Sequence, residues 1–305
     1  MQAQTWKRHW TQIKRSKYLY LLFALPFLYY LLFCYWPMNG VLIAFQNFRV
    51  RKGILGSDWV GFANFANFIT DPYFWKLVRN TILLNVYNIL FGFPAPIVLA
   101  LLMNELRNAG FKKFVQTVSY LPHFISTVVV VSMIVNFLSS DGMINMLLKA
   151  FGQTSVQFLM QPEWFRPIYV ASGIWQNVGW NSIIYLAALS NVDMQLYEAA
   201  TIDGAGRFRQ MLNVTLPGIM PTITIMFIFA VGGIMSVGFE KILLLYNGST
   251  YETADVIATY VYRRGLLKSD FSYGTAVGLF QSVIGFLFLF VTNQLSKRFG
   301  ETSLW

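Results

Sequence analysis

Charged side chains are scarce in this sequence. Only 12% of the 305 residues are Asp, Glu, Lys or Arg, and 56% are hydrophobic. Soluble domains carry about a quarter charged residues, so this composition indicates a membrane protein. Cysteine and histidine are also nearly absent. The single Cys34 excludes a disulfide or a Cys-based metal site within the chain, and neither His9 nor His123 has metal-ligand neighbours.

Catalytic signatures are missing as well. There is no phosphate-binding G-x-x-x-x-G-K-[ST] loop, and we find no paired carboxylates, nucleophile elbow or His/Cys cluster. We therefore expect no enzyme activity, no metal site and no cofactor in this chain. The net charge of +10 is better explained by loops facing anionic lipid than by nucleic acid, because the basic residues form no patch with interleaved aromatics.

Long apolar runs predict an all-α polytopic membrane protein with six transmembrane helices. The runs cover residues 18–36, 80–103, 115–138, 167–189, 218–239 and 273–295. We expect a basic tail at 1–17, a first transmembrane helix with an external segment at 18–79, and the main transmembrane domain at 80–298. The first run is too long for a typical signal peptide and lacks a small-residue cleavage site, so it is expected to be retained.

The distribution of basic residues predicts the orientation. Lys and Arg are almost equally frequent on the two sides of the six predicted spans, but the N-terminal 17 residues hold five of them and no acid. Short basic segments that flank a span favour the cytoplasm. We therefore expect both termini, and the loop at 190–217, on the cytoplasmic side.

That loop contains the most distinctive motif of the chain. Glu198-Ala199-Ala200 favour helix, and Asp203-Gly204-Ala205-Gly206 interrupt it. A second helical piece is expected from Arg207 to Leu216, ending at Pro217. By pattern alone, two interpretations remain open: an ordinary loop between membrane helices, or a helix–turn–helix unit with a function of its own.

The same stretch resembles the EAA loop of permease subunits of bacterial ATP-binding-cassette importers. Glu198-Ala199-Ala200, Asp203-Gly204-Ala205, Leu216-Pro217 and Pro221 match that family's pattern at the same spacing. The sequence departs from it at Met211, where an aromatic residue is usual, and at Val214, where isoleucine is usual. The resemblance implies the MetI-like permease fold, with a coupling helix that docks in a cleft of a cytoplasmic ATPase. It assigns that coupling role to Tyr197, Glu198, Ala199, Ala200, Asp203, Gly204 and Ala205.

Polar residues in the fourth predicted span form a second candidate site. Gly173, Asn177, Asn181 and Tyr185 recur every four residues and so lie in one row on a helix, flanked by Trp175, Gln176, Trp180 and Ser182. Two interpretations remain open. The amides either hold helices together within the membrane, or they bind sugar hydroxyls while tryptophan faces pack on the ring.

Weaker candidates for the substrate pathway lie in the last two spans. Glu240 and Lys241 close the fifth span, where an acid at membrane depth suggests function and a position beside a loop suggests a solvated helix end. Gln281 and Ser282 lie in the sixth. Gly232-Gly233 marks either close helix packing or a break that lines the pathway.

A finer resemblance extends over about three quarters of the chain. FGFPAPIVLALLMNEL, YLPHFIS, GIWQNVGWNSIIYLAAL and ETADVIATYVYRRGL are similar to permeases of carbohydrate importers, particularly the LplB-like group. This implies uptake of an oligosaccharide or polysaccharide fragment across the bacterial cytoplasmic membrane. It also implies three partners: a second permease subunit, two copies of an ATPase, and an extracellular or periplasmic solute-binding protein.

The identity of the sugar stays open at this stage. Basic residues expected on the outer side would suit either an acidic oligosaccharide or an acidic surface of the binding protein; they are Arg49, Arg51, Lys52, Arg263, Arg264 and Lys268. The rival function is a self-sufficient secondary transporter or channel. It would require ion-coupling residues in the spans and usually shows internal repeats, and the sequence shows neither.

Overall fold

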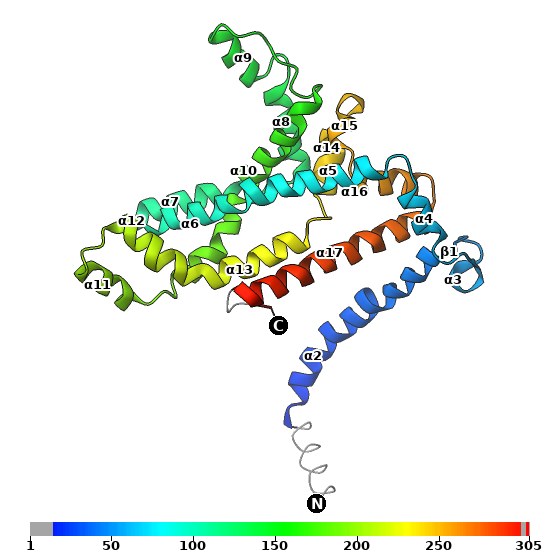
Figure 1. The fold of residues 1–305 in the computed structure, drawn as a ribbon, viewed down its shortest axis with the longest axis horizontal. Coiled ribbons are helices and arrows are strands. Elements are labelled where there is room, and N and C mark those ends of the chain that lie inside the picture. The colour runs from blue at the N-terminus through cyan, green and yellow to red at the C-terminus, as the bar shows by residue number, and fades with distance from the viewer. Residues whose placement is uncertain (1–14, 300–302, 305) are drawn as a thin grey trace, which may run out of the picture.

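The computed structural model describes residues 15–299 and 303–304. Its first long helix runs from Lys17 to Phe45, as α2 (Lys17–Tyr30), a π-helical turn η1 (Leu31–Tyr35) and η2 (Trp36–Phe45). It lies apart from the other long helices along most of its length (Figure 1), and its apolar side chains are largely exposed. The predicted end at residue 36 was wrong. Pro37 follows the π-helical turn η1 directly, and the helix continues through it.

A short hairpin follows the first helix. Strand β1 (Gln46–Asn47) pairs antiparallel with β2 (Asp58–Trp59), and α3 (Gly53–Gly56) lies between them. Helix α4 (Ala63–Ile69) comes next, within the segment that the sequence placed outside the membrane. Phe68 of α4 is buried against Phe74 and Tyr273, which anchors this outer segment to the rest of the protein.

The second long helix is continuous from Phe74 to Asn104. It consists of α5 (Phe74–Tyr87), the π-helical turn η3 (Asn88–Gly92) and α6 (Pro94–Asn104). It begins six residues before the predicted start, because the segment 74–79 carries buried Phe74 and Leu77 and continues the apolar face. The π-helical turn comes just before Pro94 and Pro96, which supply no backbone donor to a regular helix.

The third predicted span, 115–138, is not one helix. The chain forms α7 (Ala109–Tyr120) and η4 (Leu121–Phe124), and then starts again as α8 (Thr127–Leu138) and α9 (Met143–Ala150). Ile125 and Ser126 are extended between the two parts. Pro122 lies within η4 and supplies no backbone donor, and the helical conformation ends three residues after it. Helices α8 and α9 turn away from the body of the protein (Figure 1).

The fourth helix, α10 (Pro162–Leu189), packs against α6 and α7. After α11 (Met194–Ile202), the fifth long helix runs from Arg207 to Gly232 through α12 (Arg207–Gln210), η5 (Met211–Thr215) and α13 (Leu216–Gly232). The predicted end of a helical piece at Pro217 was therefore wrong. Pro217 lies in the first turn of α13, directly after the π-helical turn, so the helix continues through it.

The fifth helix ends at Gly232, not at the predicted residue 239. A Cβ atom at Gly232 would lie 2.9 Å from Cδ1 of Leu289, so the glycine permits close packing against the last helix. The structure therefore shows both alternatives for Gly232-Gly233, a close contact and a break. Beyond it lie α14 (Phe239–Leu245), η6 (Gly248–Thr250), α15 (Tyr251–Ala254), α16 (Ile257–Val261) and η7 (Tyr262–Leu267).

The last helix, α17 (Phe271–Phe299), packs against α13. Among the described residues, five helices are long and apolar enough to cross a membrane. They are Lys17–Phe45, Phe74–Asn104, Thr127–Ala150, Arg207–Gly232 and Phe271–Arg298. The 28-residue α10 has the length of a sixth, but its row of polar side chains lowers its hydropathy. The prediction of an all-α membrane protein with six spans is thus confirmed in outline.

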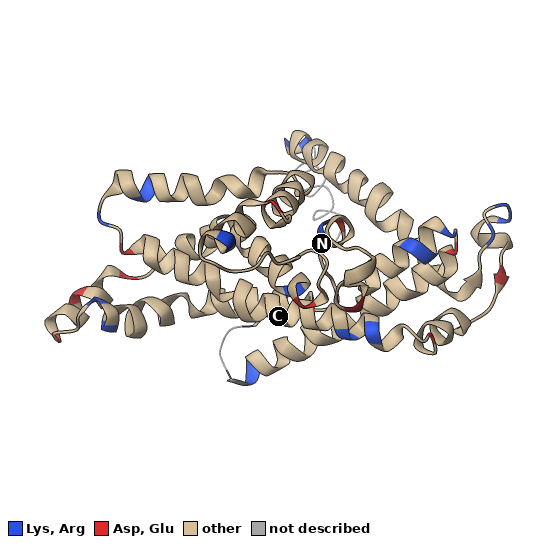
Figure 2. Ribbon diagram, turned by 90° about the horizontal axis from the view of Figure 1, so that it is seen from above, with Lys and Arg blue, Asp and Glu red and all other residues tan. Residues whose placement is uncertain are grey.

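The two ends of the bundle differ. Helix α11 lies at one end of the long helices, and β1, α3 and α4 lie at the other (Figure 1). Charged residues occur mainly at these ends and on the segments that project from the bundle (Figure 2). This arrangement keeps charges out of the apolar zone.

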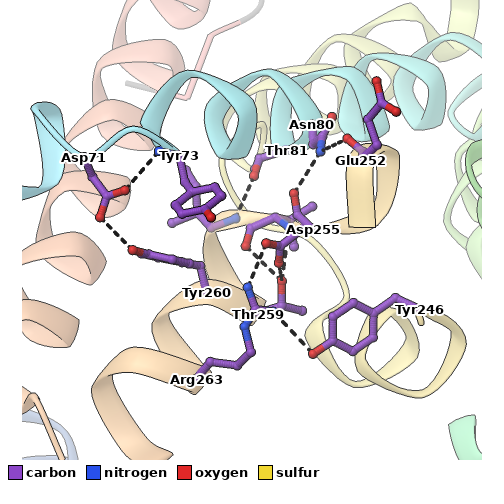
Figure 3. A network of polar contacts seen from close by, with 12 residues as sticks. Asp71, Tyr73, Asn80, Thr81, Tyr246, Glu252, Asp255, Thr259, Tyr260 and Arg263 are labelled. Carbon is purple, nitrogen blue, oxygen red and sulfur yellow. Dashed lines mark hydrogen bonds and ion pairs between the residues drawn. The ribbon is translucent and has the colours of Figure 1, made fainter. Parts of the chain in front are cut away.

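A polar network closes the end of the bundle opposite α11 (Figure 3). Asn80 on α5 donates hydrogen bonds to the carbonyl oxygens of Glu252 (2.8 Å) and Asp255 (3.0 Å). The Asp255 carboxylate accepts from Arg263 at 2.7 Å and from Thr259 at 2.8 Å. Asp255 is only 4% exposed, so these contacts satisfy a buried charge. They fix the segment 251–263 on α5.

Candidate functional site

A large cavity opens between the helices around α10. Its volume is about 1420 Å3, and α5, η3, η4, α10, α13 and α14 all contribute to its wall. The lining mixes apolar side chains with amide, hydroxyl and charged groups. A cavity of this size can hold a small oligosaccharide, and mixed apolar and polar walls are typical of small-molecule sites.

The predicted polar row of α10 lies on the cavity wall. Gly173, Asn177, Asn181 and Tyr185 all line it. Asn177 Oδ1 lies 3.0 Å from Nδ1 of His123, and Asn177 Nδ2 donates to the carbonyl of Gly173. Asn177 thus links α10 to η4, as the helix-joining interpretation supposed.

Asn181 and Tyr185 differ in their surroundings. Asn181 is exposed to the cavity and makes no hydrogen bond among those described, so its amide is free for a ligand. Tyr185 is only 2% exposed and packs with Ile97, Leu189 and Ile219 in a buried cluster. Of this row, Asn181 therefore fits the sugar-binding interpretation best.

The two tryptophans flanking the row are not equivalent. Trp180 lines the cavity, but the His123 ring stacks on it with centroids 4.5 Å apart and an interplanar angle of 3°. One face of Trp180 is therefore already covered, and only the other could pack on a sugar. Trp175 is 45% exposed and lies outside the cavity wall. The structure does not bring it to this site.

Two further predicted residues lie near the cavity. Glu240, in the first turn of α14, is exposed and lines it. Gln281 does not; its amide donates to the carbonyl of Met235 at 2.9 Å, beside a smaller hollow of about 350 Å3. That hollow shares Ser236 and Val237 with the large cavity. Glu240 therefore lies in the same cavity as the polar row, whereas Gln281 lines the smaller neighbouring hollow.

Sequence reasoning missed several polar residues of the cavity wall. His123, Asn85 and Asn88 all line it, and so does Lys241, which the sequence named only beside Glu240 as a possible solvated helix end. Asn85 and Asn88 are three residues apart in a predicted span and share a helix face, and that spacing could have revealed them. His123 and Lys241 come from segments far from α10 in the chain, so no local pattern could pair them with it.

The loop that resembles the EAA motif forms the second candidate site. Asp193 caps α11, since its Oδ1 accepts from the backbone N–H of Gln195. At the other end, Gly204 has φ +75°, and the N–H groups of Gly204 and Ala205 donate to the carbonyls of Thr201 and Ala200. This is the Schellman arrangement, which ends a helix at a residue of left-handed conformation. The predicted turn at Gly204 is confirmed.

Two hydrogen bonds hold the two halves of this loop together, and an ion pair joins the loop to the end of α6. Tyr197 Oη donates to Oγ1 of Thr215 at 2.9 Å, and Gln210 Nε2 donates to Oγ1 of Thr201 at 2.9 Å. Arg207 lies 3.8 Å from Glu105, next to the loop after α6. In the structure Arg207 faces Glu105, and Glu198 is exposed without a described ion pair.

The outer face of this loop is apolar and uncovered. Met194 is 68% exposed, Ile202 87% and Phe208 71%. Ala199 and Glu198 are exposed beside them, whereas Ala200 is half-buried. Exposed apolar residues rimmed by polar ones mark a surface for a protein partner.

Two of the basic residues expected to bind an acidic sugar or an acidic protein surface are already paired within the protein. Arg263 is bound to Asp255, and Arg264 contacts Asp71 at 3.0 Å and Asp270 at 3.3 Å. Tyr260 also donates to Asp71 at 2.6 Å (Figure 3). These two arginines therefore stabilise the fold and are not free to bind a sugar or a partner. Arg49, Arg51 and Lys268 form none of the described ion pairs and remain available.

Comparison with known proteins identifies the family to which the chain belongs. Residues 92–301 match the model of a family described as "Binding-protein-dependent transport system inner membrane component". The chain belongs to this family. It is 47% identical to the polygalacturonan/rhamnogalacturonan transport system permease protein YteP of Bacillus subtilis (strain 168), over 98% of this chain and 94% of that protein. It is 45% identical to protein LplB of the same strain, over 96% and 92%.

A solved structure has the same fold. A chain of a bacterial alginate ABC transporter, solved in complex with an alginate pentasaccharide-bound periplasmic protein, superimposes with a TM-score of 0.88. That chain is 42% identical, and the match covers 97% of this chain and 99% of that one. The family member described here is therefore a membrane-embedded permease subunit with several spans, and not an enzyme.

Proposed function

We propose that this permease forms, with a second permease subunit, the pathway by which an ATP-driven importer takes up oligosaccharides derived from polysaccharides. The observation that carries the proposal is the cavity beside α10, with the unbound amide of Asn181 in its wall. The proposal agrees with what two relatives are named for. One belongs to a transport system for polygalacturonan and rhamnogalacturonan, and the other to an alginate ABC transporter.

Two further kinds of partner follow from this proposal, besides the second permease subunit. Two copies of a cytoplasmic ATPase bind ATP and magnesium, since this chain has no phosphate-binding loop. Tyr197, Glu198, Ala199, Ala200, Asp203, Gly204 and Ala205 form the coupling surface for one of them. An extracellular or periplasmic binding protein delivers the sugar to the opposite end. The rival function, a secondary transporter, has no support from ion-coupling residues in the spans.

The orientation is part of the proposal, with both termini in the cytoplasm. Contacts group the connecting segments into two sets. Glu105 lies beside Arg207 at one end. At the other, Asn247 donates to Leu159 O, and Ser272 accepts from the N–H of Phe48. Each set should therefore lie on a single side of the membrane.

Reporter fusions test this orientation. Fusions at Asn108 and Arg207 should report the cytoplasm, and fusions at Ser57, Gln157 and Thr250 should report the exterior. The basic N-terminal segment predicts this direction. An external signal at Arg207 would place the coupling surface away from ATP and would contradict both the orientation and the proposed function.

Uptake of sugar tests the function itself. The two permeases, the ATPase and the binding protein are reconstituted in proteoliposomes with the ATPase side facing inward, and labelled oligosaccharide is added outside. We expect accumulation only with internal Mg-ATP and external binding protein. Accumulation driven by an ion gradient without ATP would favour the secondary transporter instead.

A further inference from the structure

One basic side chain in the large cavity has an unusual environment. Lys241 lies on α14, and its side chain reaches α10, where Nζ donates to the carbonyl of Tyr169 at 3.2 Å. The ammonium also lies 5.1 Å from the centre of the Tyr169 ring. Lys241 is only 8% exposed, yet it lines the cavity.

Lys241 has no anionic partner of its own. None of the described ion pairs includes it, and this holds for the adjacent Glu240, which is exposed. Burial lowers the pKa of Lys241 to about 8, so the ammonium form still predominates at neutral pH. Buried charges in proteins are usually paired, because an uncompensated one is costly. An ammonium with three donors and one described acceptor retains capacity for another ligand.

The ammonium group of Lys241 lies at one end of the polar row of α10. A Cβ atom at Gly173 would lie 3.6 Å from Lys241 Nζ, so the ammonium lies directly over this glycine. Gly173 begins the row that continues through Asn177 and Asn181. One wall of the cavity therefore presents a cation at one end and amides further along. This pattern fits a sugar that carries a ring carboxylate as well as hydroxyl groups.

We propose that Lys241 determines specificity for acidic oligosaccharides by binding the carboxylate of a uronate unit in the cavity. This inference rests on the proposed uptake function and names its substrate class. Asn181 binds hydroxyl groups of the same or the next unit. The ammonium–carboxylate contact is a charge-assisted hydrogen bond, which is stronger than the contacts a neutral hexose could make there.

Uptake by the reconstituted transporter tests this inference. The probes are trimers of galacturonate and of mannuronate, with neutral trimers of galactose and mannose for comparison. Wild type should accumulate at least one acidic trimer. Lys241→Met should lower that uptake at low sugar concentration by about tenfold or more, because it removes a hydrogen bond to a charged group. Lys241→Arg, which keeps the charge, should restore most of it.

Two controls separate this role from a structural one. Lys149→Met removes an exposed lysine on α9 and should leave uptake unchanged. The melting temperature of the purified Lys241→Met complex should not fall below that of wild type, since an apolar side chain of similar length removes the cost of burying an unpaired charge. A marked fall in melting temperature together with loss of uptake would assign Lys241 a structural role and overturn the inference.

The remaining outcomes are also decisive. Wild-type uptake of the acidic trimers by Lys241→Met would overturn the inference. Uptake of neutral trimers alone by wild type would overturn it too, while the proposed function would stand. If wild type takes up no oligosaccharide in any form, the proposed function itself fails.

Discussion

Replacing Gly204 by valine is expected to abolish sugar-stimulated ATP hydrolysis in the assembled transporter. Gly204 has φ +75°, and a Cβ atom there would meet nothing within 4 Å. The cost is therefore one of backbone conformation, about 1–2 kcal/mol for an ordinary residue and more for a β-branched one. Relief of this strain breaks the Schellman contacts at the end of α11 and changes the angle at which α11 meets the ATPase.

A matched control lies two residues away. A Cβ atom at Gly206 would also meet nothing within 4 Å, but the φ of Gly206 is −68°, which any residue adopts. Gly206→Ala should therefore keep normal hydrolysis. Both variants are purified as complexes, and the amount of bound ATPase and the sugar-stimulated rate are measured.

A second variant probes the same surface without strain. Glu198→Lys reverses an exposed charge that has no described ion pair in this chain, so the permease should fold normally. We expect Glu198 to face a basic group of the ATPase. The lysine would then place two positive charges together at a closed interface, which costs several kcal/mol, so the ATPase should be lost or uncoupled. Normal bound ATPase and normal stimulation in both Gly204→Val and Glu198→Lys would remove the coupling role from this loop.

Replacing Gly179 by alanine is expected to prevent normal assembly of the membrane domain. Gly179 is buried where α10 meets the end of α7, and a Cβ atom there would overlap the carbonyl group of Ser119 and lie 2.9 Å from the N atom of Tyr120. Backbone atoms cannot move aside as a flexible side chain can. Overpacking typically costs about 1–3 kcal/mol, and the displacement also disturbs the contact between His123 and Asn177.

The measurement is the melting temperature and yield of the detergent-purified complex. Gly278→Ala on α17 is the control, because a Cβ atom there meets nothing within 4 Å and alanine favours helix. We expect low yield or a clearly lower melting temperature for Gly179→Ala and wild-type behaviour for Gly278→Ala. Equal melting temperatures in both would mean that α7 and α10 do not approach each other this closely.

Local features were predictable from the sequence. The two halves of the loop at 190–217 are held by hydrogen bonds between residues near each other in the sequence. The glycine that ends α11 follows the helix-forming Glu198-Ala199-Ala200 and Asp203. The long apolar runs likewise predicted the spans, because the hydrophobic requirement of the bilayer is local. The polar row of α10 followed from helical periodicity alone.

Features that depend on distant segments were not predictable in this way. The stacking of His123 on Trp180 joins residues 57 positions apart and covers a face that the sequence left free for sugar. Lys241 reaches the row from α14, whereas its position in the sequence suggested a solvated helix end. The break at Ile125 and Ser126, and the passage of a helix through Pro217, depend on packing that no single window contains.

The partners of the arginines at the outer end are a further case. Arg263 and Arg264 are adjacent basic residues in a polar loop, which favoured a binding surface. Their carboxylate partners include Asp71, nearly two hundred residues earlier. Only the packed structure shows that these charges are already neutralised.

ATP hydrolysis by the complete complex in proteoliposomes tests the central claim most directly. This claim is that the permease couples a separate ATPase to the passage of an oligosaccharide. We predict a low rate with the permeases and ATPase alone, and a clear rise when sugar-loaded binding protein is added on the side opposite α11. A rate that does not respond to the loaded binding protein, in a complex that contains all subunits, would contradict the account.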